Sequence, residues 1–62
     1  MPIESFTEEE LSIIKEHKLE SIMQPGDLKL VMHEASIDRK QAFLSLIGNG
    51  GDIVNAILEL TM

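Results

Sequence analysis

A helix-start signal recurs along this chain, and the segments between successive signals are short. Side chains that can cap the free N–H groups at the start of a helix stand just ahead of successive apolar stretches, at Thr7, Asp27, Asp38 and Asp52. Glu10 follows Thr7 in the spacing of a capping box, and Gln41 follows Asp38 in the same way. Because the chain has only 62 residues, segments bounded in this way can form only short helices. We therefore predict an all-α fold.

The first segment predicts an amphipathic accessory helix within residues 7–24, after an N-terminal tail at 1–6. Helical periodicity gives this helix one apolar stripe, formed by Leu11, Ile14, Leu19 and Ile22. Glutamates in its first turn suit the positive end of the helix dipole, and Pro25-Gly26 ends the segment. We expect the helix to run from Glu8 to about Ile22.

Residues 25–62 predict three further helices. They are expected over about 28–35, 39–47 and 53–60. The glycine-rich run at 48–51 separates the last two, because Gly and Asn tolerate the backbone conformation that ends a helix. Helices this short are not stable alone, so their apolar faces must pack together. The predicted core consists of Leu28, Val31, Met32, Phe43, Leu46, Ile53, Ile57 and Leu60.

Some apolar side chains fall off these predicted core faces. Leu58 belongs to a helix that is apolar almost all round, a pattern typical of the most buried helix or of half an interface. The candidate partner-binding residues are Leu30, Leu44, Ile47 and Leu58. Leu44 and Ile47 could be shielded from solvent in two ways, either by the accessory helix folded back over them or by a partner protein. We favour the accessory helix, because it is already tethered to the same chain.

No constellation of residues predicts catalysis, a cofactor site or a metal site. His17 and His33 lie on separate predicted helices, with no third ligand at a fixed spacing. Cysteine is absent, and no serine has a His–Asp arrangement near it. The glycine run at 48–51 lacks the preceding strand and the following Gly-Lys-Ser/Thr of a phosphate loop. We therefore expect a non-enzymatic protein, with no catalytic, cofactor-binding or metal-binding residues.

The charge of the chain restricts its partners. Lys and Arg number 5 against 11 Asp and Glu, a net charge of −6, which opposes electrostatic binding to nucleic acid or anionic lipid. No apolar run is long enough to span a membrane, and no signal-peptide pattern is present. We therefore expect a cytoplasmic protein whose partner is another protein.

The helical segments resemble one known family. The resemblance lies in Asp-Leu-Lys-Leu-Val-Met at 27–32, Asp-Arg at 38–39 and Gly-Asp-Ile-Val-Asn-Ala-Ile-Leu-Glu-Leu-Thr-Met at 51–62. These runs are similar to the ubiquitin-associated (UBA) type domain at the C-terminus of the alpha subunit of the nascent polypeptide-associated complex. Huntingtin-interacting protein K, a relative of that subunit, shares the helical frame and a Leu-Thr ending. The resemblance implies a UBA-like three-helix bundle over 25–62, with the helix of 7–24 added to it.

The same resemblance implies a docking role without chemistry. In the alpha subunit, the UBA-type domain docks targeting and processing factors in ribosome-associated, chaperone-related work on nascent chains. In the K-type relatives, the UBA-like domain anchors on the N-terminal acetyltransferase that modifies nascent chains, and a helix precedes it. The Gly- and Val-rich β-barrel of the alpha subunit is not among these 62 residues. Leu44 and Ile47 are apolar where that subunit is expected to have basic or polar residues.

Ubiquitin binding and self-association are the alternative functions. Ubiquitin-binding UBA domains resemble one another in a Met-Gly-Phe/Tyr loop after the first helix of the bundle. The corresponding loop here is Ala-Ser-Ile at 35–37, so we expect weak or absent ubiquitin binding, with a dissociation constant no tighter than about 1 mM. A homodimer would form through the same apolar residues, which are Leu30, Leu44, Ile47 and Leu58.

Overall fold

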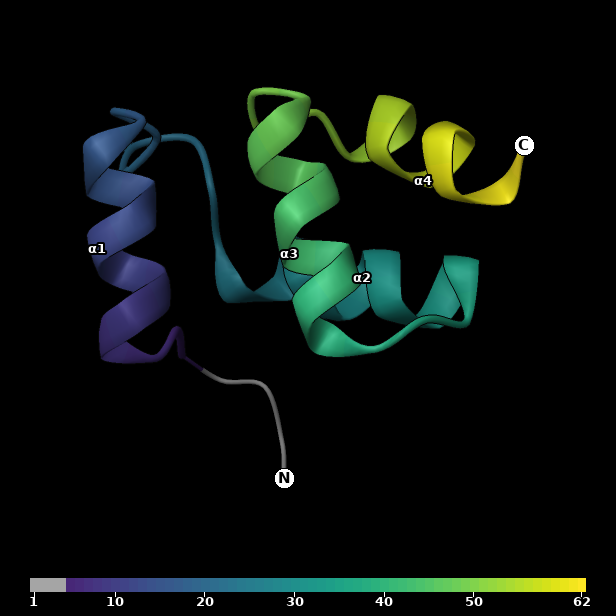
Figure 1. Cartoon of the computed structure of the whole chain (residues 1–62), viewed down its shortest axis with the longest axis horizontal. Helices are drawn as coiled ribbons and strands as arrows, with labels where there is room; N and C mark the ends of the chain where they lie inside the picture. Colours follow the sequence, from purple (N-terminus) through teal and green to yellow (C-terminus); the bar gives the residue numbers. More distant parts are fainter. Residues whose placement is uncertain (1–4) are drawn as a thin grey trace.

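The computed structural model describes residues 5–62, and over that range it consists of helices and turns with no strand. The helices are α1 (Glu8–Glu16), α2 (Pro25–Ala35), α3 (Arg39–Gly48) and α4 (Ile53–Thr61). Helices α2, α3 and α4 pack against one another as a three-helix unit. Helix α1 stands beside α3, on the side away from α4 (Figure 1). The prediction of an all-α fold is confirmed.

The predicted caps begin α1, α3 and α4. The Thr7 hydroxyl accepts from the Glu10 N–H at 3.1 Å, and the Glu10 carboxylate accepts from the Thr7 N–H at 2.9 Å, which completes the capping box. The Asp38 carboxylate accepts from the Gln41 N–H at 2.9 Å. The Asp52 carboxylate accepts in the same way from the Asn55 N–H, at 3.1 Å.

Helix α2 begins earlier than the sequence suggests. Its N-cap is Gln24 rather than Asp27, and its first residue is Pro25. Proline suits this position because its fixed φ is helical and its missing N–H would have had no partner within the helix. Asp27 instead lies one turn in, where its carboxylate accepts from the Gln24 N–H at 3.2 Å.

Helix α1 is shorter than predicted, ending at Glu16 rather than near Ile22. Lys18 adopts the left-handed conformation, with φ of 58°. The Leu19 N–H then turns back to the Ile14 carbonyl at 2.9 Å, a bond that ends a helix in this way. Residues 17–24 are therefore turns and extended chain, not a continuation of the helix.

The early end of α1 divides its predicted apolar stripe. Ile14 is 1% exposed and Leu19 is buried, whereas Leu11 and Ile22 are about half exposed. Met23, which the stripe did not include, is buried. Helical periodicity fails beyond Glu16 because the chain is no longer helical there.

The core lies between the three-helix unit and the segment that precedes it. Its buried apolar residues are Ile14, Leu19, Met23, Leu28, Val31, Ala42, Phe43, Leu46 and Ala56. The other members of the predicted core pack against these residues but are only partly buried; they are Met32, Ile53, Ile57 and Leu60. Ala56 is the only buried residue of α4. The most apolar helix is therefore not the most deeply buried one.

Contacts at Gly51 and Phe6 help to hold the N-terminal segment against the three-helix unit. Gly51, with φ of 86°, lies so close to Ile22 that a Cβ there would be 2.9 Å from Ile22 Cγ2. The ring of Phe6 meets that of Phe43 edge-on, with their centroids 6.2 Å apart. The predicted tail at 1–6 lies outside the described residues except for Ser5 and Phe6. None of the helices within residues 5–62 combines the length and the apolar character that crossing a bilayer requires.

Candidate functional site

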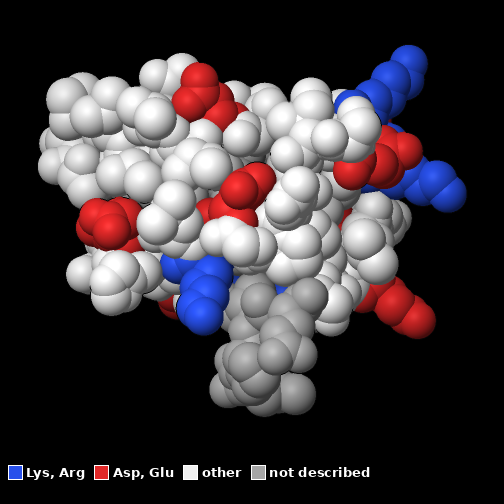
Figure 2. All heavy atoms as spheres, turned by 180° about the vertical axis from the view of Figure 1, so that it is seen from behind, with Lys and Arg blue, Asp and Glu red and all other residues white. Residues whose placement is uncertain are grey.

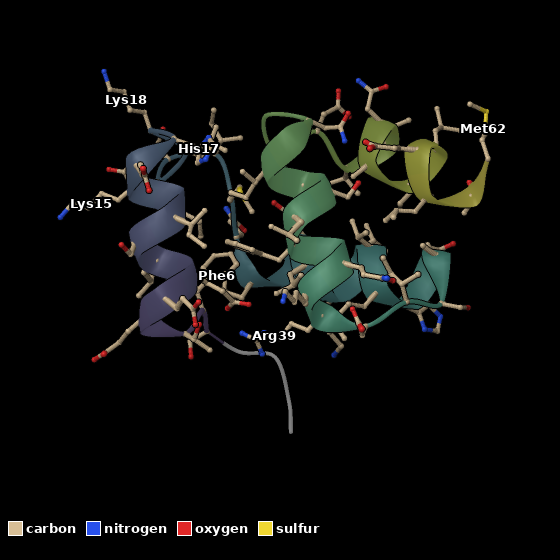
Figure 3. The ribbon with its side chains drawn as sticks, in the orientation of Figure 1. Phe6, Lys15, His17, Lys18, Arg39 and Met62 are labelled. Carbon is tan, nitrogen blue, oxygen red and sulfur yellow. The ribbon has the colours of Figure 1, made fainter. Side chains whose placement is uncertain are left out.

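An ion pair joins the starts of α1 and α3. Arg39 donates from Nη2 to Glu10 Oε1 at 2.7 Å and from Nε to Glu10 Oε2 at 2.8 Å. Two parallel bonds of this kind fix direction as well as distance. Arg39 Nη2 also donates to the Ser5 carbonyl at 3.0 Å. Figure 3 shows Arg39 and Phe6 in the space between the two helices, so these contacts determine where α1 sits.

The Glu10 carboxylate has two roles at once. It closes the capping box of its own helix and binds Arg39 on the neighbouring one. The hydrogen bond from Arg39 is the main cause that lowers the pKa of Glu10 below its ordinary value of 4.5. Partial burial opposes this shift, and the Thr7 N–H adds to it. Formation of α1 and its docking on α3 are therefore linked through one side chain.

Glu10→Gln should remove this ion pair while nearly keeping the shape of the side chain. We expect the free energy of unfolding at neutral pH to fall by about 1–3 kcal/mol, the range for hydrogen bonds to charged groups. Because the pKa of Glu10 is lower in the folded chain, this stabilisation is present above the unfolded pKa and is lost as the pH falls through the folded pKa. Urea denaturation of both proteins should therefore converge as the pH falls below about 4.5.

The control for this experiment is Glu16→Gln, at the exposed end of the same helix. It should change the free energy of unfolding by less than about 0.5 kcal/mol at any pH, as surface substitutions usually do. A difference between wild type and Glu10→Gln that stays constant down to acid pH would contradict a charged role for Glu10.

The predicted partner-binding residues are exposed, with one exception. Leu30 on α2 is 43% exposed, Leu44 on α3 is 52% exposed, and Leu58 on α4 is 48% exposed. Ile47 instead packs partly buried against the core. The prediction missed Val54, which is 66% exposed and precedes Leu58 by one helical turn. The i, i+4 spacing of Val54 and Leu58 on one apolar helix was the signal that could have identified it.

Polar side chains of α4 and its N-cap form hydrogen bonds within the chain. Asp52 accepts from the backbone N–H of Asn55 and from its Nδ2, each at 3.1 Å. Glu59 accepts from Nδ2 of Asn49, at the end of α3. Figure 2 shows a broad surface over α4 and the adjoining part of α2 on which charged side chains are few. Helix α4 itself carries one charged side chain, Glu59, so the exposed row of Val54 and Leu58 has few charges beside it on its own helix.

Leu44 lies between two hollows on the outer face of α3. One, of about 370 Å³, faces α1 and is lined by Thr7, Glu9, Glu10, Ile13, Arg39, Lys40, Phe43 and Leu44. The other, of about 420 Å³, faces α4 and is lined by Ile37, Gln41, Leu44, Ser45, Glu59 and Leu60. Contrary to expectation, the accessory helix does not cover Leu44. The reason is that α1 ends at Glu16 and sends Ile14 into the core, leaving half of Leu44 open.

The histidines and the basic end of α1 form no evident chemical site. His17 follows the last turn of α1, and Lys15 and Lys18 beside it point away from the rest of the molecule (Figure 3). His33 lies on α2 and is exposed. Within residues 5–62, no three His, Asp or Glu side chains come together in a way that could hold a metal ion.

No protein-family model matches the chain. No solved structure matches it either. What the protein does must therefore be inferred from its exposed residues and from the motifs of its own sequence.

Proposed function

We propose that this chain is a non-enzymatic docking module of the nascent polypeptide-associated complex alpha type, working in the cytoplasm on ribosome-associated processing or targeting of nascent chains. The observation that supports this best is the exposure of Leu30, Leu44 and Leu58 on a unit whose core forms without them. Each helix of the unit thus presents at least one large apolar side chain that a partner could contact.

The positions of the motif residues support a UBA-like bundle over 25–62. The run at 27–32 forms the body of α2, where Leu28 and Val31 are fully buried. The run at 51–62 forms α4 with its N-cap, and Ala56 is its buried contact with the core. The three helices pack mutually, as a three-helix bundle requires.

The proposed docking surface is the exposed row of Val54 and Leu58 on α4. The hollow beside Leu44, between α3 and α4, is a second apolar feature of the same three-helix unit. That hollow has an apolar lining from Ile37, Leu44 and Leu60. Its only charged group, Glu59, is hydrogen-bonded to Asn49. An apolar side chain of a partner can pack on Ile37, Leu44 and Leu60 there, while the exposed Glu59 carboxylate keeps its hydrogen bond to Asn49.

One observation favours the K-type relatives as a second candidate. In those proteins a helix precedes the UBA-like domain, and here α1 precedes 25–62 and is docked on it through Glu10 and Arg39. In that case the partner would be the N-terminal acetyltransferase, and the chain would regulate it.

Binding measurements with charged substitutions test the proposal. Leu58→Lys adds a charge within the row of Val54 and Leu58, and Leu11→Lys adds one at an equally exposed leucine of α1. We expect wild type to cosediment with translating ribosomes or to bind purified N-terminal acetyltransferase. Leu58→Lys should weaken that binding by about tenfold or more, equivalent to about 1.4 kcal/mol. Leu11→Lys should bind as wild type does, and circular dichroism should show that both variants remain helical.

Three outcomes would overturn the proposal. Wild type could bind neither ribosomes nor the acetyltransferase. Light scattering could show a dimer that Leu58→Lys converts to a monomer, which would assign the surface to self-association. Titration with ubiquitin could give saturable NMR shifts at tens of micromolar, whereas we expect a dissociation constant no tighter than about 1 mM.

A further inference from the structure

The hollow between α1 and α3 is shaped like a groove with two matching walls. The two helices begin at the same end of the molecule and run side by side (Figure 1). Glu9 and Ile13 line it from α1, and Lys40 and Leu44 line it from α3. Each pair is spaced i, i+4, so each wall is one row of a helix surface with a charge at one end and an apolar side chain one turn later.

The groove has an apolar base and two free charges. Phe43 is buried beneath it, Ile13 is partly buried, and Leu44 is half exposed. Glu10 and Arg39 also line it, but they neutralise each other in their ion pair. Glu9 and Lys40 are exposed, and within residues 5–62 neither takes part in an ion pair. The charges available to a ligand are therefore one carboxylate on the α1 wall and one ammonium on the α3 wall.

We propose that this groove binds one amphipathic helix of a partner protein that carries a basic flank toward α1 and an acidic flank toward α3. Two helices that run side by side, each with an apolar side chain on the facing wall, can accept a third helix as bundles do. Its apolar row would contact Ile13 and Leu44. The flank charges follow from Glu9 and Lys40, because a helix with the same charge on both flanks would meet a like charge on one wall.

This surface is separate from the row of Val54 and Leu58 on α4, and it shares only Leu44 with the hollow between α3 and α4. It depends on α1, which supplies one of its walls and is held in place by Glu10 and Arg39. The three-helix unit alone would not form it. The proposal stands whether or not the chain acts on ribosomes.

Model helices of defined charge test the proposal with the intact chain. The probes are three stapled peptides of about four helical turns, long enough to be helical with the staple. All three carry the same row of leucines. The mixed peptide has one basic and one acidic flank, the second peptide has two basic flanks, and the third has two acidic flanks. Titration into the isotope-labelled chain, followed by NMR, gives the affinity and the residues contacted. We expect wild type to bind the mixed peptide about threefold or more tightly than either of the others, with shifts centred on Ile13 and Leu44.

Charge reversal on one wall should change that preference in a predictable direction. Lys40→Glu makes both walls acidic and should shift the preference to the peptide with two basic flanks, by about fivefold or more. Glu9→Lys should shift it to the peptide with two acidic flanks. Both residues are exposed, so neither change threatens the fold. The control is Lys29→Glu, which makes the same charge change at an exposed residue of α2 that does not line the groove. It should leave the order of the three peptide affinities as in wild type.

Two results would overturn the proposal. The first is that none of the three peptides gives saturable shifts at Ile13 and Leu44. The second is that Lys40→Glu and Lys29→Glu have the same effect on the order of affinities, because peptide binding would then follow only the net charge of the chain.

Discussion

Phe43→Ala should lower the free energy of unfolding by about 3–5 kcal/mol, the cost of removing a buried aromatic side chain. Phe43 is buried in α3 and meets the Phe6 ring of the N-terminal segment. The substitution therefore removes a contact within the three-helix unit and one that holds α1. A domain of this size has a stability near the low end of about 5–15 kcal/mol, so the variant should retain only about 0–2 kcal/mol and be unfolded in a measurable fraction, up to about half, at room temperature.

Circular dichroism with thermal and urea denaturation measures this effect. The control is Leu44→Ala, at the next residue of the same helix, which is half exposed. Its cost should remain below about 1 kcal/mol, because less apolar surface returns to water. A cooperative transition of Phe43→Ala close to that of wild type would show that Phe43 lies outside the core in solution.

Gly51→Ala should be the most destabilising single-methyl addition among the glycines of the chain. Its φ of 86° disfavours any residue with a Cβ, at a cost of about 1–2 kcal/mol. The new methyl group would also lie 2.9 Å from Ile22 Cγ2 and 3.3 Å from Met23 Cγ. Displacing packed side chains adds about 1–3 kcal/mol. We expect a total loss of about 2–5 kcal/mol and reduced protection of residues 17–24.

Gly50→Ala separates these two contributions. Gly50 has a φ of 64°, but beyond its immediate chain neighbours no atom lies within 4 Å of the position that a methyl group would take there. It should therefore lose only about 1–2 kcal/mol, for the backbone alone. Equal losses in the two variants, measured by urea denaturation, would mean that Ile22 and Met23 do not pack against this turn.

The parts of the fold that the sequence predicts are those fixed by neighbouring residues. Thr7 with Glu10, Asp38 with Gln41, and Asp52 with Asn55 each interact over three residues, so their spacing is visible in the chain. The exposure of Leu30 and Leu58 follows in the same way from the periodicity of helices whose bounds were nearly right. Ile47 was also predicted to be available to a partner, but it is partly buried. Periodicity gives the direction of its side chain on the helix but not how closely the core packs around it.

The parts that were missed depend on contacts between distant residues or on unmarked backbone conformations. Arg39 and Glu10 are 29 residues apart, and many other pairs of opposite charge were equally available in the sequence. Lys18 ends α1 in the left-handed conformation, where glycine is the usual residue, so no sequence signal marked that end. The exposure of Leu44 was missed for the same reason. A longer α1 was expected to cover it, and the observed helix ends at Glu16.

The central claim is that the folded chain keeps Leu30, Leu44, Val54 and Leu58 uncovered in solution. Methyl NMR of the intact chain with a soluble gadolinium chelate tests it directly, because the chelate broadens only methyl signals that solvent reaches. We predict strong broadening at these residues and protection of Leu28, Val31 and Leu46, unchanged when the protein is diluted. Protection of the four exposed residues to the same degree as the core, or protection that disappears on dilution, would contradict the claim and indicate that α1 or a second copy of the chain covers them.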